Sequence, residues 1–145
     1  MKVKDKKVDN LSKAEQLCNH LSHEGADLII LPEMFNCPYE TELFSEYAEY
    51  IPGKTTDRLS SIAKRLQVYI VGGSIPEREG NDIYNTSPIF DPAGKLIAKH
   101  RKMHLFNVDI PEKITFRESD FLEAGSETTV FDAGSFKIGI AICYD

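Results

Sequence analysis

The sequence predicts an α/β fold in which helices cover a mixed β-sheet. Two amphipathic segments with helical spacing alternate with two short, wholly apolar segments, which are typical of strands covered on both faces. Farther along the chain, two pairs of strand-like segments are each joined by a turn-forming stretch, as in antiparallel hairpins. This combination favours a layered α/β sandwich. The 145 residues, of which 41% are hydrophobic and 28% charged, suit one globular domain.

The first helix and the first strand precede the first candidate site residue. Ser12 and Glu15 form a capping box that predicts the start of the helix, and the apolar stripe of this helix ends before Gly25. The apolar run 28–31 then predicts a buried strand, which stops at Pro32.

The middle of the chain repeats this order and then changes character. The apolar stripe within 59–66 predicts a second helix, which leads into a buried strand at 68–71. Segments 83–90 and 96–99 flank a Pro- and Gly-containing stretch at 91–95 that suits a tight turn. We therefore expect an antiparallel hairpin here.

The last part of the chain combines an irregular stretch with a second hairpin. The polar segment 107–126 is expected to be an irregular loop, and a loop of that length is more often functional than filler. Segments 128–131 and 136–142 are predicted strands around a turn at 132–135. The chain ends shortly after the apolar stretch 138–142, so nothing remains to cover that strand. Either partner chains complete the core or the sequence is truncated.

Composition excludes several classes of function. The net charge of −6, from 23 acidic and 17 basic residues, gives no electrostatic basis for binding nucleic acid or an anionic membrane. No apolar run approaches the ~18 residues of a membrane span, and the charged start of the chain does not resemble a signal peptide. We expect a cytoplasmic protein whose partners are small molecules or other proteins. Three widely spaced cysteines, Cys18, Cys37 and Cys143, argue against a disulfide framework.

Three residues are candidates for chemistry, each with an alternative interpretation. Cys143 ends an apolar strand, where a nucleophile can be exposed, although a free cysteine is often simply a core residue. Cys18 fits that core interpretation better, and Cys37 fits either. Glu33 follows the first buried strand and could act as a general base or be a solvated loop acid. Lys102 lies in a basic run, which is usually a solvated face.

Two other patterns do not support a site. The segment Gly53-Lys54-Thr55 lacks the earlier glycine of a phosphate-binding loop, because that position is Ala48. His100 and His104 have ligand-like spacing, but no second pair of ligands follows, so we expect no metal site.

Three segments resemble the catalytic segments of the nitrilase superfamily of carbon–nitrogen hydrolases. These are Leu-Pro-Glu-Met-Phe-Asn-Cys-Pro-Tyr at 31–39, His-Arg-Lys-Met-His-Leu-Phe at 100–106 and Gly-Ile-Ala-Ile-Cys-Tyr-Asp at 139–145. The segments 72–76 and 84–87 are also similar to family segments. Within the superfamily the chain is most similar to the ω-amidases, and the likeness runs from about residue 10 to the last.

The resemblance implies an α-β-β-α sandwich of which residues 1–145 form a part. Such a part would lack the first strand, because 1–9 is Lys-rich, and the C-terminal half. It would also lack most of the carboxylate-binding pocket.

The resemblance also implies a mechanism. Cys143 would attack an amide carbon to form a thioester, Glu33 would be the general base, and Lys102 with the Tyr144 N–H would stabilise the oxyanion. Glu118 falls on the second glutamate of the family, although it could also be a solvated loop acid. Tyr144 would in addition contact the substrate.

Substrate, cofactor and assembly are further implications of the same resemblance. ω-Amidases hydrolyse the terminal amide of 2-oxo dicarboxylic acid monoamides, such as 2-oxoglutaramate, without a metal or organic cofactor. Tyr39 would help bind this substrate, and the full-length protein would be a homo-oligomer, a dimer or larger. The alternatives are another amidase of the superfamily, an N-carbamoyl amide hydrolase, or a non-catalytic fragment.

Overall fold

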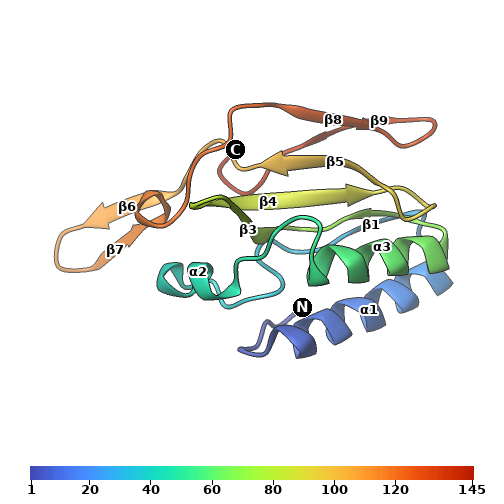
Figure 1. Cartoon of the computed structure of the whole chain (residues 1–145), viewed down its shortest axis with the longest axis horizontal. Coiled ribbons are helices and arrows are strands. Elements are labelled where there is room, and N and C mark those ends of the chain that lie inside the picture. Colours follow the sequence, from blue (N-terminus) through green and yellow to red (C-terminus); the bar gives the residue numbers. More distant parts are fainter.

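The computed structural model describes all 145 residues and has three layers (Figure 1). Helices α1 (Lys7–His23) and α3 (Lys54–Leu66) cover one face of a five-stranded sheet. The hairpin of β8 (Thr129–Asp132) and β9 (Lys137–Ile140) packs on the opposite face. The α/β class with mixed sheets is confirmed, and the layers are those of an α-β-β-α sandwich without its second helical layer.

The central sheet is mixed because its first two strands are parallel and the others antiparallel. Strand β1 (Leu28–Ile30) pairs with β2 (Tyr69–Val71), as expected for strands joined through helices. Strand β2 and strand β3 (Ile75–Glu79) then share one edge of the long strand β4 (Asp82–Phe90), while β5 (Leu96–Arg101) takes the other edge. The predicted β4–β5 hairpin is confirmed, whereas β3 was not predicted.

The two long helices differ in how well the sequence locates their ends. α3 is preceded by Gly53, whose N–H donates to Thr56 Oγ1 at 2.7 Å, and it ends at Gln67, which adopts a left-handed φ of 56°. The predicted capping box of α1 is wrong, since this helix begins at Lys7 and Ser12 lies inside it. The polar residues before the apolar stripe extend the helix, and the Asn10 side chain ties its start to the backbone of residue 4.

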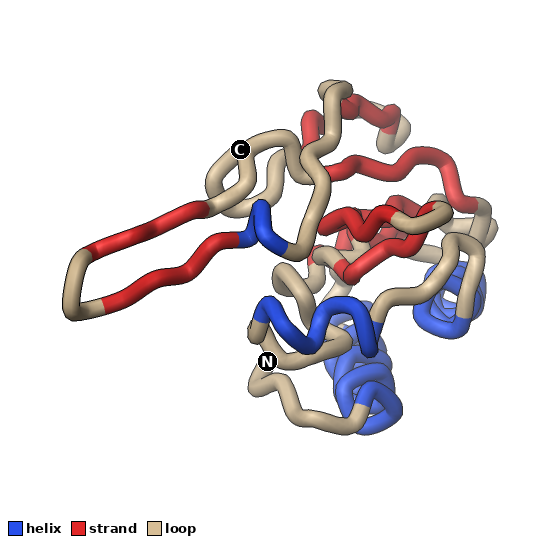
Figure 2. Tube along the Cα trace, turned by 60° about the vertical axis from the view of Figure 1, so that its left-hand side comes forward, coloured by secondary structure: helices blue, strands red, loops and turns tan.

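The segment 107–126 is not irregular as expected. Strands β6 (Asn107–Ile110) and β7 (Ile114–Arg117) form a hairpin that projects from the body of the molecule (Figure 2). The 3-10 turn η2 (Glu118–Asp120) follows and returns the chain to the sheet. The connection between β1 and α3 contains the 3-10 turn η1 (Thr41–Leu43) and the short helix α2 (Phe44–Tyr47).

Two apolar layers hold the sheet between its neighbours. The larger lies between the helices and the sheet, and its buried members are Ala14, Cys18, Ile29, Leu31, Phe35, Leu59, Ile62, Ala63, Val68, Ile70, Ile75 and Phe90. The smaller lies under the β8–β9 hairpin, where Phe131 contacts Val71 and Ile89.

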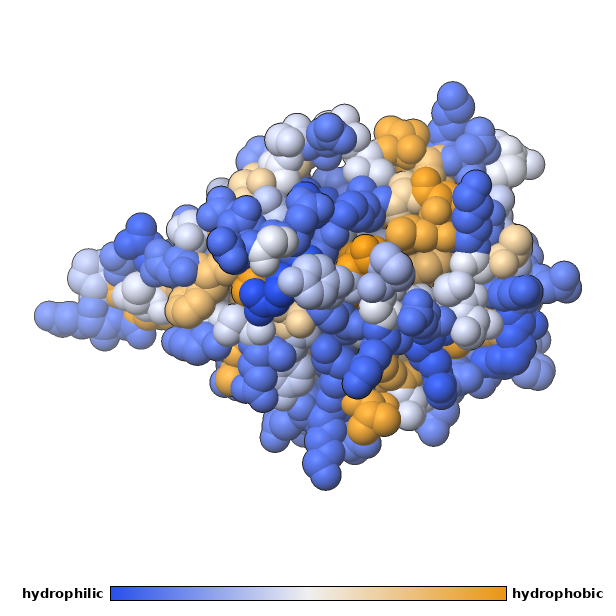
Figure 3. Space-filling view, in the orientation of Figure 1, coloured by the Kyte–Doolittle hydropathy of each residue, from blue (hydrophilic) through white to orange (hydrophobic).

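The apolar stretch 138–142 is therefore partly covered, contrary to expectation, and Ile142 is buried. The exposed apolar side chains lie elsewhere. Ile30 is 65% exposed, so β1 is not covered on both faces, and Phe136 is 72% exposed. Hydrophobic residues gather at the β8–β9 side of the molecule (Figure 3). No helix combines the length and apolar composition that crossing a bilayer requires.

Candidate active site

A buried lysine between two carboxylates forms the centre of the candidate site. Lys102 Nζ lies 3.1 Å from Glu33 Oε1 and 3.0 Å from Glu118 Oε2. Lys102 and Glu118 are 0% exposed, which excludes a solvated face for the one and a solvated loop acid for the other. Burial alone would lower the pKa of Lys102, but its hydrogen bond to Glu118 and the charge of Glu33 outweigh that effect and raise the pKa. Lys102 is therefore a fixed ammonium ion.

The Glu33 loop is held by a close approach of two backbone segments. Gly73 has a φ of 56°, and a Cβ at this position would lie 2.0 Å from the Pro32 carbonyl oxygen, so only glycine fits. The next residue, Ser74, donates its N–H to that same carbonyl at 3.2 Å, and its Oγ accepts the Met34 N–H at 3.0 Å. Glu33 therefore leaves β1 along a path fixed on both sides.

Asn85 in β4 connects Glu33 to Lys102, and sequence reasoning gave it no role. Its Nδ2 donates to Glu33 Oε1 at 2.8 Å, and its carbonyl accepts the Lys102 N–H at 2.9 Å. The segment 84–87 resembled the family, but only the strand register shows which of its side chains reaches Glu33.

Lys102 and Glu118 are fixed through their backbones as well. The Gly125 N–H donates to the Lys102 carbonyl at 2.8 Å, and a Cβ on Gly125 would lie 2.3 Å from the Arg101 oxygen. Glu118 and Phe106 exchange two hydrogen bonds: the Glu118 N–H to the Phe106 carbonyl at 3.1 Å, and the Phe106 N–H to Glu118 Oε2 at 2.6 Å. The charges are thus held by a rigid frame.

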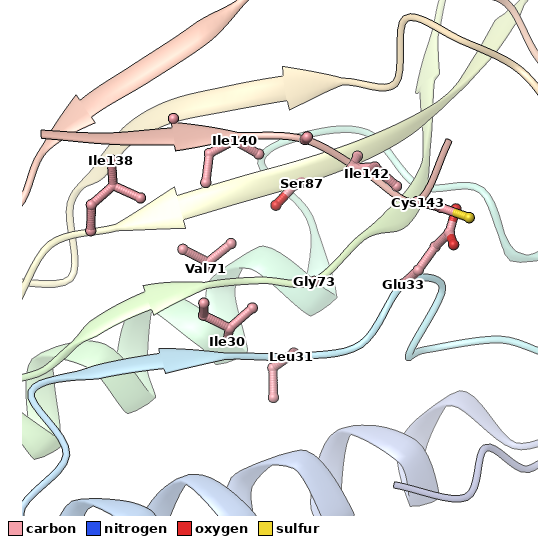
Figure 4. Close-up of a pocket in the computed structure, with 12 residues that line it drawn as sticks. Ile30, Leu31, Glu33, Val71, Gly73, Ser87, Ile138, Ile140, Ile142 and Cys143 are labelled. Atoms are coloured by element: carbon pink, nitrogen blue, oxygen red, sulfur yellow. The ribbon is translucent and has the colours of Figure 1, made fainter. Parts of the chain in front are cut away.

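Cys143 brings a thiol to the exposed side of Glu33. It follows β9 on a turn where its φ is 49°, a left-handed conformation that is uncommon for a cysteine and typical of strained functional positions. The sulfur and the Glu33 carboxylate point toward each other (Figure 4). Partial desolvation and the negative charge of Glu33 raise the pKa of this thiol, while Lys102 acts in the opposite direction.

The other cysteines have no such environment. Cys18 faces the core from α1, as the sequence indicated, and burial raises its pKa to about 11. Cys37, for which the sequence left both interpretations open, is packed against Met34 and Phe44, and burial raises its pKa to about 12. Only Cys143 is an exposed thiol.

A cavity of about 240 Å³ opens beside Glu33 and Cys143. Its floor is mostly hydrophobic, and the lining side chains come from four strands and the loops after them (Figure 4). The lining residues are Ile30, Leu31, Glu33, Val71, Gly73, Ser87, Ile138, Gly139, Ile140, Ala141, Ile142 and Cys143.

Asp145 ties the turn that carries Cys143 to the loop that follows Lys102. Its carboxylate accepts the N–H groups of Ile142, Met103 and His104 at 3.0, 2.8 and 2.9 Å, and it lies 2.8 Å from His100 Nε2. Although burial alone would raise it, these hydrogen bonds lower the pKa of Asp145 to about 2. The two histidines of the ligand-like pair thus share one carboxylate, and no group of three or more His, Cys, Asp or Glu residues is arranged for a metal ion.

The two tyrosines named from the sequence have different surroundings. Tyr39 donates its hydroxyl to Glu118 and stacks on Phe116 with ring centroids 5.7 Å apart, and its pKa is raised by burial and by that carboxylate. Tyr144 is 64% exposed next to the thiol, with its ring edge-on to Phe106. Its backbone N–H makes no hydrogen bond within the chain.

Known proteins resemble this chain in sequence and in structure. The omega-amidase NIT2-B of Xenopus laevis is 50% identical over 139 residues, which cover 96% of this chain and 50% of that protein. The omega-amidase NIT2 of Mus musculus is 47% identical over 145 residues, or 100% of this chain and 52% of that protein. The crystal structure of Saccharomyces cerevisiae Nit3 has a TM-score of 0.84 at 36% identity, covering 98% of this chain and 52% of that one.

The chain thus spans about half the length of the curated relatives it matches. Nit3 is a member of branch 10 of the nitrilase superfamily. The carbon-nitrogen hydrolase pattern matches residues 3–145, and since this is nearly the whole sequence, the chain belongs to the carbon-nitrogen hydrolase family, in the nitrilase superfamily.

Proposed function

We propose that this chain carries the catalytic residues of a cysteine-dependent amidase. The substrate would be the terminal amide of a 2-oxo dicarboxylic acid monoamide, with 2-oxoglutaramate giving 2-oxoglutarate and ammonia. The observation that carries the proposal is that Glu33 joins the other two residues, although the three are far apart in sequence. Its carboxylate lies 3.1 Å from Lys102 Nζ and faces the Cys143 sulfur beside the cavity. They supply a proton acceptor, a positive charge and a nucleophile, which amide hydrolysis through a covalent intermediate requires.

The first step transfers the Cys143 proton to Glu33. The thiolate attacks the amide carbon, and the tetrahedral intermediate collapses to a thioester as Glu33 returns the proton to the departing ammonia. Water activated by the same carboxylate then hydrolyses the thioester. The raised pKa of the thiol supports a base-assisted attack, because a free thiolate would be scarce at neutral pH.

The oxyanion would be stabilised from two directions. The ammonium of Lys102 has three N–H donors, and the two carboxylates occupy part of that set, which leaves a donor for the substrate oxygen. The unpaired N–H of Tyr144 is the second donor. A donor of this kind in a dry site is worth about 3–4 kcal/mol of transition-state stabilisation.

Glu118 and the tyrosines would support this arrangement. Glu118 holds the Lys102 ammonium and is itself fixed by the hydroxyl of Tyr39. We propose that Tyr39 and Tyr144 also border the substrate, Tyr144 with its exposed ring. The substrate assignment draws on the omega-amidase relatives, since the cavity is mainly apolar and its lining residues do not include a group that would bind the carboxylate of the substrate.

We also propose that residues 1–145 are one part of a hydrolase domain, and that this part lacks the first strand and the C-terminal half of the domain. This is supported by their coverage of about half of the relatives. The complete protein is proposed to be a homo-oligomer, a dimer or larger, which light scattering on the complete gene product tests.

The amidase proposal is tested by ammonia release from 2-oxoglutaramate by the complete gene product that contains these residues. An N-carbamoyl amino acid and a simple aliphatic amide serve as competing substrates. Cys143→Ala should abolish turnover and the acyl-enzyme mass in intact mass spectrometry, whereas Cys37→Ala should retain both. Undiminished turnover by the Cys143→Ala protein would refute the mechanism, and preference for a competing amide would refute the substrate.

A further inference from the structure

The hydrogen bonds to Glu33 are all made to one of its two oxygens. Oε1 accepts from Asn85 Nδ2 at 2.8 Å, from Lys102 Nζ at 3.1 Å and from the Tyr39 hydroxyl at 3.5 Å. None of these three donors bonds Oε2. A carboxylate has two equivalent oxygens, so this one-sided arrangement fixes its rotation and leaves a single oxygen free.

The shortest of these bonds comes from a side chain that makes no other hydrogen bond. Asn85 is 0% exposed, and its Oδ1 has no hydrogen-bond partner. Buried amide oxygens are nearly always bonded, and leaving one unpaired is unfavourable for folding. The burial of this amide is therefore not explained by stability, and its one hydrogen bond is directed at the proposed general base.

The position of Asn85 in the fold makes that bond rigid. Asn85 lies in β4, between β3 and β5, and its carbonyl accepts the N–H of Lys102. One residue thus sets the place of the lysine through its backbone and the orientation of Glu33 through its side chain. An amide can do this without adding charge to a site that already holds Glu33, Glu118 and Lys102.

We propose that Asn85 is a positioning residue that orients Glu33 so that its free oxygen faces the Cys143 thiol. This inference rests on the proposed function, in which Glu33 takes the thiol proton. Four titratable groups face Glu33: the ammonium of Lys102, the carboxylate of Glu118, the hydroxyl of Tyr39 and the thiol of Cys143. Among the groups that donate a hydrogen bond to Glu33, only the amide of Asn85 cannot gain or lose a proton.

The test compares Asn85→Asp and Asn85→Ser with the parent in the complete gene product. Two quantities are measured against pH: kcat and KM for amide hydrolysis, and the rate at which iodoacetamide alkylates Cys143 without substrate. Asp replaces a donor with a carboxylate of the same shape beside Glu33, and two adjacent carboxylates retain a proton to higher pH. Ser removes the donor without adding charge.

Asn36 provides a matched control. It is also 0% exposed with an unpaired Oδ1, and its Nδ2 donates to Glu49 at 3.3 Å, away from Cys143. Asn36→Asp therefore places a like charge beside a partly buried carboxylate outside the site. Any effect on stability alone should appear in this variant too.

We expect Asn85→Asp to lower kcat at least about tenfold, with a change in KM below about threefold. In Asn85→Asp, the acid limbs of the kcat profile and of the alkylation profile should both move to higher pH by about one pH unit or more. In Asn36→Asp, both acid limbs should stay in place. Asn85→Ser should lower kcat with a smaller displacement of the limbs. A folded Asn85→Asp or Asn85→Ser protein with parental kcat and unchanged limbs would overturn the proposal.

The alkylation arm separates this proposal from the proposed function. If the parent hydrolyses no amide but the alkylation limb still moves in Asn85→Asp, the positioning role stands and the amidase assignment fails. If the parent is an active amidase and neither limb moves, the positioning role fails alone. Should Asn85→Asp not fold, the same comparison is made with Asn85→Ser.

Discussion

Replacing Lys102 by methionine removes a buried charge while keeping most of the side-chain volume. In the parent, the ammonium lies between two carboxylates, and both Lys102 and Glu118 are 0% exposed. In Lys102→Met, Glu118 retains only the hydroxyl of Tyr39 and the N–H of Phe106 as donors. A negative charge is then left without its cation inside the protein.

The size of the effect follows from that burial. Breaking a buried ion pair by removing one partner costs about 3–5 kcal/mol. Because the Glu33 side chain is 23% exposed and water can reach it, we take the lower end, about 3 kcal/mol, for Lys102→Met. For a domain of this size that corresponds to a fall in Tm of roughly 6–12 °C.

Urea unfolding of the complete gene product, followed by circular dichroism, measures this loss in a double-mutant cycle. Adding Glu118→Gln removes the unpaired charge, so the double variant should recover about 1–2 kcal/mol relative to Lys102→Met. Acidification should also narrow the difference between Lys102→Met and the parent, because a protonated carboxylate needs no cation. A single variant within about 1 kcal/mol of the parent, or a double variant no more stable than Lys102→Met, would refute the buried-pair reasoning.

Three further predictions concern the cysteines, Asp145 and the isolated chain. In the native protein, iodoacetamide should alkylate Cys143 at least about a hundredfold faster than Cys18 or Cys37, since burial raises the pKa of those two thiols to about 11 and about 12. Peptide mass spectrometry measures the labelling of each cysteine, and equal labelling would contradict the prediction. The pKa of Asp145 is lowered from 3.8 to about 2, so its contribution of about 2 kcal/mol should be present above pH 3.8 and lost as the pH falls through about 2. Asp145→Asn should remove that acid-dependent part from urea titrations at several pH values, whereas an unchanged acid profile would exclude the role. The 145 residues alone should be inactive and aggregate, because apolar side chains such as Phe136 are 72% exposed, and a cooperative monomeric melt with amide turnover would contradict this.

Elements with strong apolar periodicity were predicted well, and elements whose pattern is mixed were not. The helix at 54–66 and the β4–β5 and β8–β9 hairpins follow from apolar spacing and turn residues. The β6–β7 hairpin was missed because its strands carry many polar residues. Val108 and Ile110 alternate with polar neighbours, as do Ile114 and Phe116, and this period of two was the available signal.

The basic run at 99–102 shows why burial in the site could not be read from charge alone. Residues 99–101 form the end of strand β5, where successive side chains face opposite sides of the sheet, and Lys102 directly follows this strand. Lys99 and Arg101 therefore pair with Glu77 on one side, while His100 and Lys102 are buried on the other. The sequence contains this alternation, but the partners that make a buried lysine tolerable come from distant segments.

The paired state of Lys102 has a consequence for a ketone-bearing substrate. A 2-oxo acid carries a carbonyl that condenses with a neutral primary amine to give an imine, and such an adduct would block turnover. The two carboxylates raise the pKa of Lys102 and keep its nitrogen protonated, so it has no lone pair to attack the ketone. In the proposed amidase, the same carboxylates that hold the ammonium would therefore keep this amine from reacting with the ketone, and the Cys143 thiol would attack the substrate without a competing amine.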